Sequence, residues 1–153
     1  MGDGVPKRSA AAGIPDTGYS GTPLPKKLGF KAGQRVLFVA APSHLDELIA
    51  GAPAFTRLAR LAPFDFALAF VTAQAALRHE LDRLAPRLDD AGMIWIAWPK
   101  KTSGVASDVN ENDVRREAIA RGLVDVKVCA IDATWSGLKL VRRVANRKAG
   151  TRE

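Results

Sequence analysis

Three predominantly apolar runs divide the chain, and they predict the strands of a buried sheet. Continuous apolar runs, unlike alternating ones, are typical of parallel strands that are covered on both faces. Residues 124–131 alternate between apolar and polar positions, as a strand with one more polar face does. A last strand is predicted over residues 138–144, and the short turn at 133–137 makes these two strands antiparallel neighbours. The three apolar runs are RVLFVAA (35–41), DFALAFVT (65–72) and MIWIAW (93–98).

A stripe of leucines is the strongest helical signal in the chain. Four leucines recur at spacings of four, three and four residues, which places them on one face of a helix. Thr72 precedes this helix in the position of an N-cap, and the Asp-Asp-Ala-Gly segment at 89–92 is predicted to end it. The leucines are Leu77, Leu81, Leu84 and Leu88.

A second helix is predicted from its two ends. Asn110 can cap a helix that continues to about Arg121, and Gly122 is suited to stop it. Residues 54–61 are ambiguous, because their apolar positions fit either a weak strand or a helical turn.

Two short helices are predicted nearer the N-terminus. Pro25 can open one of them and Gly29 can close it. Residues 43–46, Ser-His-Leu-Asp, have the pattern of a capping box, so a short helix is predicted to begin there and to end at Gly51. The segment 18–33, which is punctuated by Gly and Pro, could fold over the sheet edge as a lid.

The order of these elements predicts the fold class. Strands that alternate with helices form a mainly parallel sheet with helices on both faces, here with an antiparallel C-terminal hairpin, in a Rossmann-like α/β architecture. A length of 153 residues suits one domain, which we place at residues 18–147. Residues 1–17 lack periodicity and are predicted to be disordered, and residues 148–153 are predicted to form a basic tail.

The net charge of +7 lies at the two ends of the chain. Residues 1–33 carry +3 and residues 139–153 carry +5, so the remainder sums to −1. Basic termini bind nucleic acid and other polyanions nonspecifically, or they keep a protein in solution, and both interpretations stand at this point.

No segment of the sequence indicates export or membrane insertion. No apolar stretch follows the basic residues near the N-terminus, and no run approaches the roughly 18 apolar residues of a membrane span. The single cysteine, Cys129, excludes a disulfide framework and is predicted to be a small buried residue within a strand. We therefore expect a cytoplasmic protein without a membrane partner.

Polar residues are predicted to gather at the carboxyl edge of the sheet, where ligands bind in folds of this class. Two lysines, hydroxyl groups and flexible glycines can form a pocket for an anionic small molecule, with Trp98 or Trp135 as a stacking wall. The alternative is that the lysines are solvated loop charges and the tryptophans plug the end of the sheet. The candidate ligand-binding residues are Lys100, Lys101, Thr102, Ser103, Gly104, Trp135, Ser136 and His44.

The sequence offers few groups for catalysis. His44 opens a helix beside the candidate site, where it could act as an acid–base group, contact a ligand or only begin the helix. His79 is predicted to lie on the polar face of the leucine helix. Ser103 and Ser136 have neither a partner base nor a G-x-S-x-G elbow, and no phosphate-binding P-loop is present. We assign no catalytic residue and no metal ligand.

Three separated phrases resemble a family of short bacterial proteins that is known only as a domain of unknown function. They are YSGTPLPKKLG (19–29), WPKKTSG (98–104) and DATWSGLKLV (132–141), and the likeness spans about residues 18–147. The resemblance is specific because the three phrases agree in order, but it implies no activity.

The architecture also resembles class I S-adenosylmethionine-dependent methyltransferases, more distantly. Residues 28–37 are similar to the approach to their first strand, and residues 84–96 are similar to the helix, glycine turn and strand of their central half. The resemblance implies a Rossmann-like fold that ends in an antiparallel hairpin. The chain is short for their seven-stranded sheet, so we expect a truncated relative.

The likeness breaks down at the residues that would hold the cofactor. Those enzymes carry a glycine-rich loop after the first strand, whereas residues 40–45 here contain no glycine. The acidic residue that would hold the ribose hydroxyls is also missing, and Arg57 and Arg60 stand in that segment. After the second buried strand, where many of those enzymes have Asn-Pro-Pro-Tyr, residues 72–74 are Thr-Ala-Gln. We therefore expect no cofactor, with S-adenosylmethionine as the one that the resemblance leaves open.

These observations lead to three hypotheses. The first is a noncatalytic binding or regulatory protein on a degenerate methyltransferase-like scaffold, with an anionic ligand or partner at residues 100–104. The second is an active methyltransferase with an unusual cofactor loop. The third is a nucleic-acid-associated protein that uses its basic termini.

Overall fold

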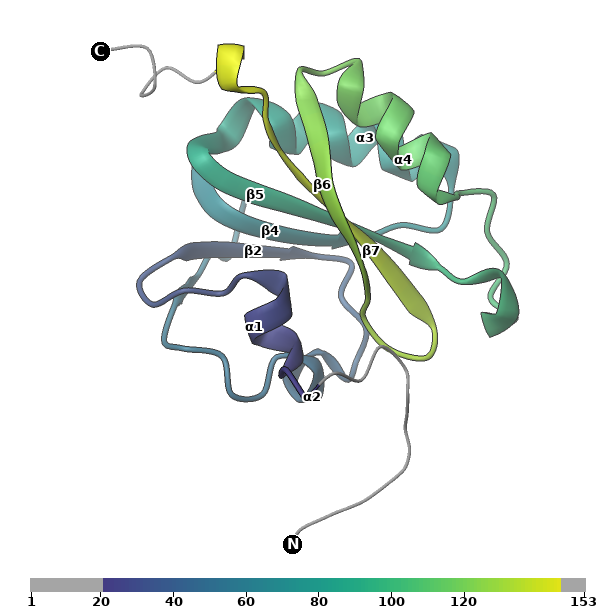
Figure 1. Cartoon of the computed structure of the whole chain (residues 1–153), viewed down its shortest axis with the longest axis horizontal. Helices are drawn as coiled ribbons and strands as arrows, with labels where there is room; N and C mark the ends of the chain where they lie inside the picture. Colours follow the sequence, from purple (N-terminus) through teal and green to yellow (C-terminus); the bar gives the residue numbers. More distant parts are fainter. Residues whose placement is uncertain (1–20, 147–153) are drawn as a thin grey trace, which may run out of the picture.

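The computed structural model describes residues 21–146, which fold around one six-stranded sheet (Figure 1). The spatial order of the strands is β3-β2-β4-β5-β7-β6. The first four strands of this order run parallel, and β7 runs antiparallel to both β5 and β6. The bounds are β2 Arg35–Val39, β3 Thr56–Arg57, β4 Phe64–Phe70, β5 Leu88–Pro99, β6 Leu123–Ala130 and β7 Trp135–Arg142. The predicted α/β class and the antiparallel C-terminal hairpin are confirmed.

Helices cover both faces of the sheet, as predicted. Figure 1 shows α3 and α4 over one face and α1 and α2 over the other. The buried residues form two clusters, one on each face. The bounds are α1 Leu24–Leu28, α2 Leu45–Leu48, α3 Gln74–Leu84 and α4 Glu111–Ile119, with 3₁₀ turns at Ala85–Arg87, Lys101–Ser103 and Val144–Asn146.

The sequences of the central strands are continuous apolar runs because both faces of these strands are buried. In β4, Ala67 and Ala69 belong to the cluster beneath α3 and α4, whereas Phe66 and Leu68 belong to the cluster beneath α1. Successive side chains of a strand point to opposite faces, so every position in such a strand must be apolar.

Helix α1 is fastened to the sheet by one buried hydrogen bond. The indole Nε1 of Trp95, in β5, donates to the carbonyl oxygen of Leu28 at 2.8 Å. Phe30 then stacks on Phe66 with ring centroids 4.1 Å apart. Gly29 ends the helix with a φ of 92°, a left-handed conformation that favours glycine, which confirms the predicted stop.

The leucine stripe forms a helix, but its predicted ends are wrong. Leu77, Leu81 and Leu84 are fully buried on α3, whereas Leu88 begins β5. Pro86 accounts for this end, because its ring removes the N–H that would continue the helix. At the other end Thr72 makes no cap; the backbone N–H of Gln74 donates to Asp108 Oδ1 at 2.9 Å.

Two further expectations are corrected, and one is confirmed. No capping box forms at residues 43–46, and α2 is a single turn that follows His44. The final strand begins at Trp135 and not at residue 138, because Trp135, Ser136 and Gly137 pair with the end of β5. The predicted cap at Asn110 is confirmed, and it is a capping box: the Asn110 side chain accepts from the backbone of Asp113 at 2.9 Å while the Asp113 carboxylate accepts from the backbone of Asn110.

The ambiguous segment 54–61 contains β3, a two-residue strand that pairs in parallel with β2. Cys129 and His79 lie as predicted, the first buried and the second exposed.

Among the residues that the structure describes, no helix has the length and hydropathy needed to cross a bilayer. The predictions for 1–17, for 148–153 and for the start of the lid segment lie outside these residues, and the domain bounds 18–147 stay a prediction.

Strand β5 runs through residues 89–92, which were expected to end the leucine helix. Gly92 makes this path of β5 possible because it has no side chain. The backbone of β4 passes so close to it that a Cβ atom would not fit. A Cβ atom built on Gly92 would lie 2.6 Å from the carbonyl oxygen of Asp65 and 2.9 Å from Leu88. The register between β4 and β5 shifts between Phe64 and Phe66, at the same point. The glycine therefore serves a close approach of two strands and not a helix stop.

Replacing Gly92 by alanine should destabilise the fold. The methyl group would push β4 and β5 apart, and overpacking of this kind costs about 1–3 kcal/mol. The free energy of unfolding, measured in urea, should fall by that amount in Gly92→Ala. Ala91→Thr, at the exposed neighbouring position, is the control and should change it by less than about 0.5 kcal/mol. An unchanged stability in Gly92→Ala would contradict the close approach.

An ion pair links the start of β2 to β4. Asp65 accepts from the backbone N, Nε and Nη2 of Arg35 at 2.8, 3.1 and 2.9 Å. The hydrogen bonds from the Arg35 side chain lower the pKa of the Asp65 carboxyl below its usual value, although partial burial opposes them. The folded state thus binds this proton less readily than the unfolded state does.

The stabilisation from Asp65 should therefore be complete above the ordinary pKa of an aspartate and should be lost as the pH falls through the lowered one. Asp65→Asn should be less stable than the original protein at pH 7, and the difference should shrink as the pH falls below about 4. Chemical unfolding at a series of pH values measures this. Asp46→Asn, at an exposed position, should show no such trend, and a difference that does not change with pH would refute the assignment.

Candidate functional site

The carboxyl edge of the sheet brings together the two predicted groups of polar residues. Lys100 directly follows β5, and Trp135 and Ser136 open β7 opposite Pro99 and Trp98. The backbone N–H of Lys100 donates to the carbonyl oxygen of Thr134 at 2.8 Å, which joins the two segments. The short β6–β7 turn therefore lies beside the loop after β5.

A hollow of about 460 Å³ lies along the loop between β5 and α4. Lys100 is half-buried and Lys101 is exposed, and within residues 21–146 neither ammonium group forms an ion pair. Gly104 turns the loop with a φ of 80°. The hollow is lined by Pro99, Lys100, Lys101, Gly104, Val105, Ala106, Ser107, Asp108, Val109 and Asn110.

The carboxylate of Asp108 is the one acidic group at this hollow, and it is already engaged. It accepts the backbone N–H of Gln74 at 2.9 Å. The Gln74 side chain in turn donates to the Asp108 carbonyl oxygen at 2.7 Å and to the Asp113 carboxylate at 2.7 Å. These contacts fix the lining at Asp108 to the N-terminus of α3. Within residues 21–146 the side chains of Lys100 and Lys101 have no such partners.

The other predicted residues do not line this hollow. Ser103 accepts the backbone N–H of Val105 at 3.1 Å, and Thr102 is exposed. Trp135 packs edge-on against Phe70 with centroids 5.0 Å apart, on the face that α1 covers. Trp98 is buried in the opposite cluster, so it offers no stacking wall. The structure thus separates the candidate residues into a lysine-lined hollow and a group around the β6–β7 turn.

His44 makes a contact that the sequence did not indicate. Its Nε2 lies 2.8 Å from Asp132 Oδ2, across 88 residues of chain. Because a carboxylate can only accept, Nε2 carries the proton. The other carboxylate oxygen, Oδ1, accepts the backbone N–H groups of Thr134 and Trp135, each at 2.8 Å. The turn therefore orients Asp132, and Asp132 orients the imidazole.

The His44–Asp132 pair is accessible from solvent. The side chains are 38% and 22% exposed, so the imidazole can meet a ligand. A histidine that is oriented by a carboxylate can move a proton or hold a polar ligand atom. Sequence reasoning named His44 but missed Asp132. The signal was the Asp-Ala-Thr-Trp turn itself, since an aspartate often accepts the backbone N–H groups that follow it.

The residues near the loop after β2 do not fit S-adenosylmethionine in the manner that the methyltransferase resemblance implies. Ala40 begins this loop with a φ of 54°, a conformation that favours glycine, so the backbone turns there while a methyl group is retained. Arg57 stands on β3, where an acidic residue would hold the ribose, and its guanidinium lies 5.0 Å from the centre of the Phe38 ring. His44, from the same loop, is bonded to the β6–β7 turn.

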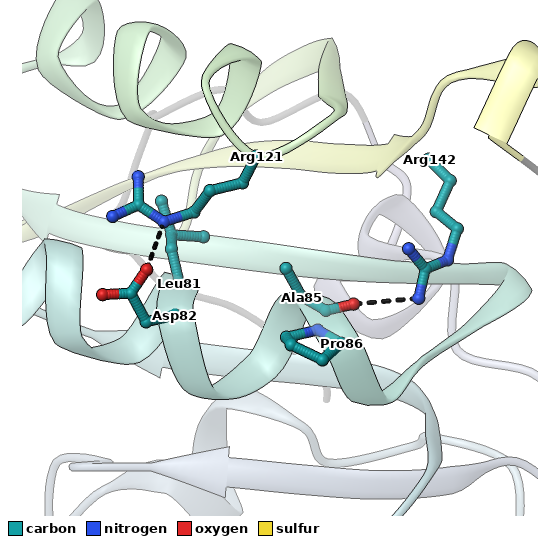
Figure 2. Close-up of a pocket in the computed structure, with 6 residues that line it drawn as sticks. All are labelled: Leu81, Asp82, Ala85, Pro86, Arg121 and Arg142. Atoms are coloured by element: carbon teal, nitrogen blue, oxygen red, sulfur yellow. Dashed lines mark hydrogen bonds and ion pairs between the residues drawn. The ribbon is translucent and has the colours of Figure 1, made fainter.

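A second hollow, of about 230 Å³, lies between α3, the end of α4 and β7 (Figure 2). Arg121 donates to Asp82 at 2.8 Å and to Glu117 at 2.9 Å. Partial burial opposes its charge, but these hydrogen bonds raise the pKa of Arg121. Arg142 donates to the carbonyl oxygens of Ala85 at 2.9 Å and Leu88 at 2.7 Å. Arg121 thus joins the end of α4 to α3, and Arg142 joins β7 to the turn after α3 and to the start of β5.

No cluster of three or more metal-ligating side chains occurs in the described part of the chain. The arginines of the second hollow were missed by sequence reasoning, because nothing in the local sequence distinguishes an arginine that caps a distant helix from a solvated one.

Comparison with protein families gives one match. Residues 72–144 match the model of the family described as "Protein of unknown function (DUF3052)". This segment includes two of the three phrases that carry the resemblance, at 98–104 and 132–141, and excludes the phrase at 19–29. A search of curated proteins gave no match.

Comparison with solved structures finds methyltransferases at low sequence identity. Precorrin-6y C5,15-methyltransferase from Geobacter metallireducens GS-15 is 9% identical, with a TM-score of 0.57 over 78% of this chain and 86% of that chain. Magnesium protoporphyrin IX methyltransferase from Synechocystis PCC 6803, with bound SAM, is 11% identical, with a TM-score of 0.54 over 78% and 74%. Ribosomal protein L11 methylase from Lactobacillus delbrueckii subsp. bulgaricus is 12% identical, with a TM-score of 0.52 over 78% and 74%.

At these identities the likeness concerns the fold alone. Both resemblances that the sequence suggested are confirmed, the specific one to a family of unknown function and the distant one to methyltransferases. The chain has a truncated fold of the class I methyltransferase type, and its residues 72–144 match the family described as "Protein of unknown function (DUF3052)".

Proposed function

We propose that this protein is a noncatalytic binding protein that holds an anionic small molecule in the hollow beside Lys100 and Lys101. The hollow of about 460 Å³ falls within the range of about 300–1,000 Å³ that small-molecule sites occupy. It lies beyond the carboxyl end of β5, the edge at which open α/β sheets bind ligands.

The observation that carries the proposal is the pair of unpartnered ammonium groups at this edge. A lysine that lines a hollow without an acidic partner attracts an anion. Its positive charge offsets the free-energy cost of taking the anion's charge out of water. Lys100 is the better placed of the two, since its backbone is fixed to Thr134 and its side chain is half-buried. Asp108, the one acidic residue of the lining, already accepts from Gln74, and its negative charge favours a ligand that binds at the lysines.

The chemistry of the lining supports binding without catalysis. Among the ten residues that line the hollow there is no histidine, cysteine or glutamate, and the one aspartate serves as a helix cap. Lys100, Lys101 and Ser107 are the lining groups that could act as a base or a nucleophile, and within the described residues none of them is hydrogen-bonded to a histidine or carboxylate that would activate it. The His44–Asp132 pair is not among the residues that line it.

A second candidate function is methyl transfer with an unusual cofactor loop. The observation that favours it is the shared fold, since one of the similar structures is a methyltransferase with bound SAM. The glycine-free loop at 40–45 and Arg57 on β3 weigh against it. Titration with S-adenosylmethionine separates the two functions, because the first expects no heat of binding and the second expects saturable binding.

The proposal predicts that an anion such as inorganic pyrophosphate binds through the two lysines. In isothermal titration calorimetry of the full chain, Lys100→Gln/Lys101→Gln should weaken pyrophosphate binding about tenfold, which corresponds to about 1.4 kcal/mol. The control is Lys26→Gln/Arg60→Gln, which removes the same charge at two exposed positions away from the hollow. Equal weakening in both double variants would show that only net charge matters, and the site would be refuted.

A further inference from the structure

Two lysines lie directly opposite one another on the C-terminal hairpin. Lys127 of β6 and Lys139 of β7 are register partners in the antiparallel pair. Cys129 and Gly137, two residues away on each strand, are also partners, and Cys129 packs in the cluster on the α1 face. Because side chains alternate along a strand, both lysines point to that same face.

Like charges at directly opposed positions destabilise a sheet. The pKa of Lys139 is lowered, first by partial burial and then by the positive charges of Lys127 and Lys31. Lys31 is therefore a third lysine whose charge repels that of Lys139. In the described residues Lys31, Lys127 and Lys139 have no ion-pair partner. We call these three residues the lysine triad.

Protection of a sheet edge does not explain the triad. A lysine on an exposed edge strand discourages pairing with another chain, and Lys127 on β6 fits that role. Lys139 does not, because β7 is an internal strand with β5 on its other side. Lys139 pairs there with Trp95 and is only half-exposed, at a position where the sheet would ordinarily carry an apolar residue. The fold thus retains a charge where it costs stability.

The triad also lies apart from both hollows described above. None of its members lines the hollow at Lys100 or the one at Arg121. The three ammonium groups come from three segments, the loop after α1 and the strands β6 and β7. Several separated positive charges, with Lys31 and Lys127 exposed and Lys139 half-exposed, suit an extended polyanion better than a small ligand, which needs a concave site.

We propose that the lysine triad of Lys31, Lys127 and Lys139 is a binding face for the phosphodiester backbone of nucleic acid. Lysine contacts to phosphate groups are independent of base sequence and release condensed counterions. Lys31 and Lys139 fall within the two basic ends of the sequence, but both lie in the described domain, so this face is distinct from binding through residues 1–20 or 147–153.

The salt dependence of binding tests this face. The full chain and its variants are titrated with a fluorescent 20-base-pair DNA duplex at several salt concentrations, and binding is followed by anisotropy. Each phosphate contact contributes about 0.9 to the slope of log K against log salt concentration. Lys127→Gln/Lys139→Gln should therefore reduce the magnitude of the slope by about 1.8. The termini are present in every variant, so their contribution cancels from the comparison.

Arg78→Gln/Arg87→Gln is the matched control, because it removes the same charge at two exposed positions, on α3 and in the turn after it, over the opposite face of the sheet. It should keep the original slope for DNA. The Lys127→Gln/Lys139→Gln variant should melt at the same or a higher temperature than the original protein, because a repulsive pair is removed. An unchanged slope in that variant, or an equal loss in the control, would overturn the proposal. The pyrophosphate titration reports separately on the Lys100 site.

Discussion

The insertion of β7 between β5 and β6 is the constraint on which the rest of this structure depends. An antiparallel strand that pairs on both sides satisfies the backbone of two neighbours at once, and it returns the β6–β7 turn to the carboxyl edge of the sheet. From that turn, Thr134 accepts a hydrogen bond from Lys100, and Asp132 holds His44. The same pairing places Lys139 between Lys127 and Trp95. The contacts of Lys100, His44 and Lys139 are thus consequences of one strand.

The fold and the chemistry of this protein point in different directions. A parallel sheet with an antiparallel last strand is shared with methyltransferases, because the layers and the burial of the strands decide the architecture. The loops at the carboxyl ends decide the activity, and they are free to change. Here Ala40 takes a conformation that favours glycine, Arg57 replaces an acid, and two lysines border the main hollow. The fold is shared, while the residues at the carboxyl edge of the sheet are of a different kind.

Sequence reasoning placed the candidate residues at the correct edge but could not group them. The order of strands and helices was sufficient to bring residues 100–104 and the 133–137 turn to one end of the sheet. It could not show that Trp135 turns toward Phe70, on the far side of the sheet from the cluster that holds Trp98. Asp132 and the arginines at Asp82 and Ala85 were missed, because their partners lie tens of residues away in the chain.

The sequence by itself determined the strands, the helices and the class of fold, because apolar periodicity reflects burial and burial depends on local positions. It also determined the stops at Gly29 and Gly122 and the cap at Asn110, which involve neighbouring residues. Only the tertiary structure decided the features that need two distant segments. These are the cap of α3 by Asp108, the passage of β5 through Gly92, and the pairs His44–Asp132 and Lys127–Lys139. A hydrogen bond or a repulsion between such segments leaves no periodic trace in the chain, since its geometry exists only after the sheet has assembled.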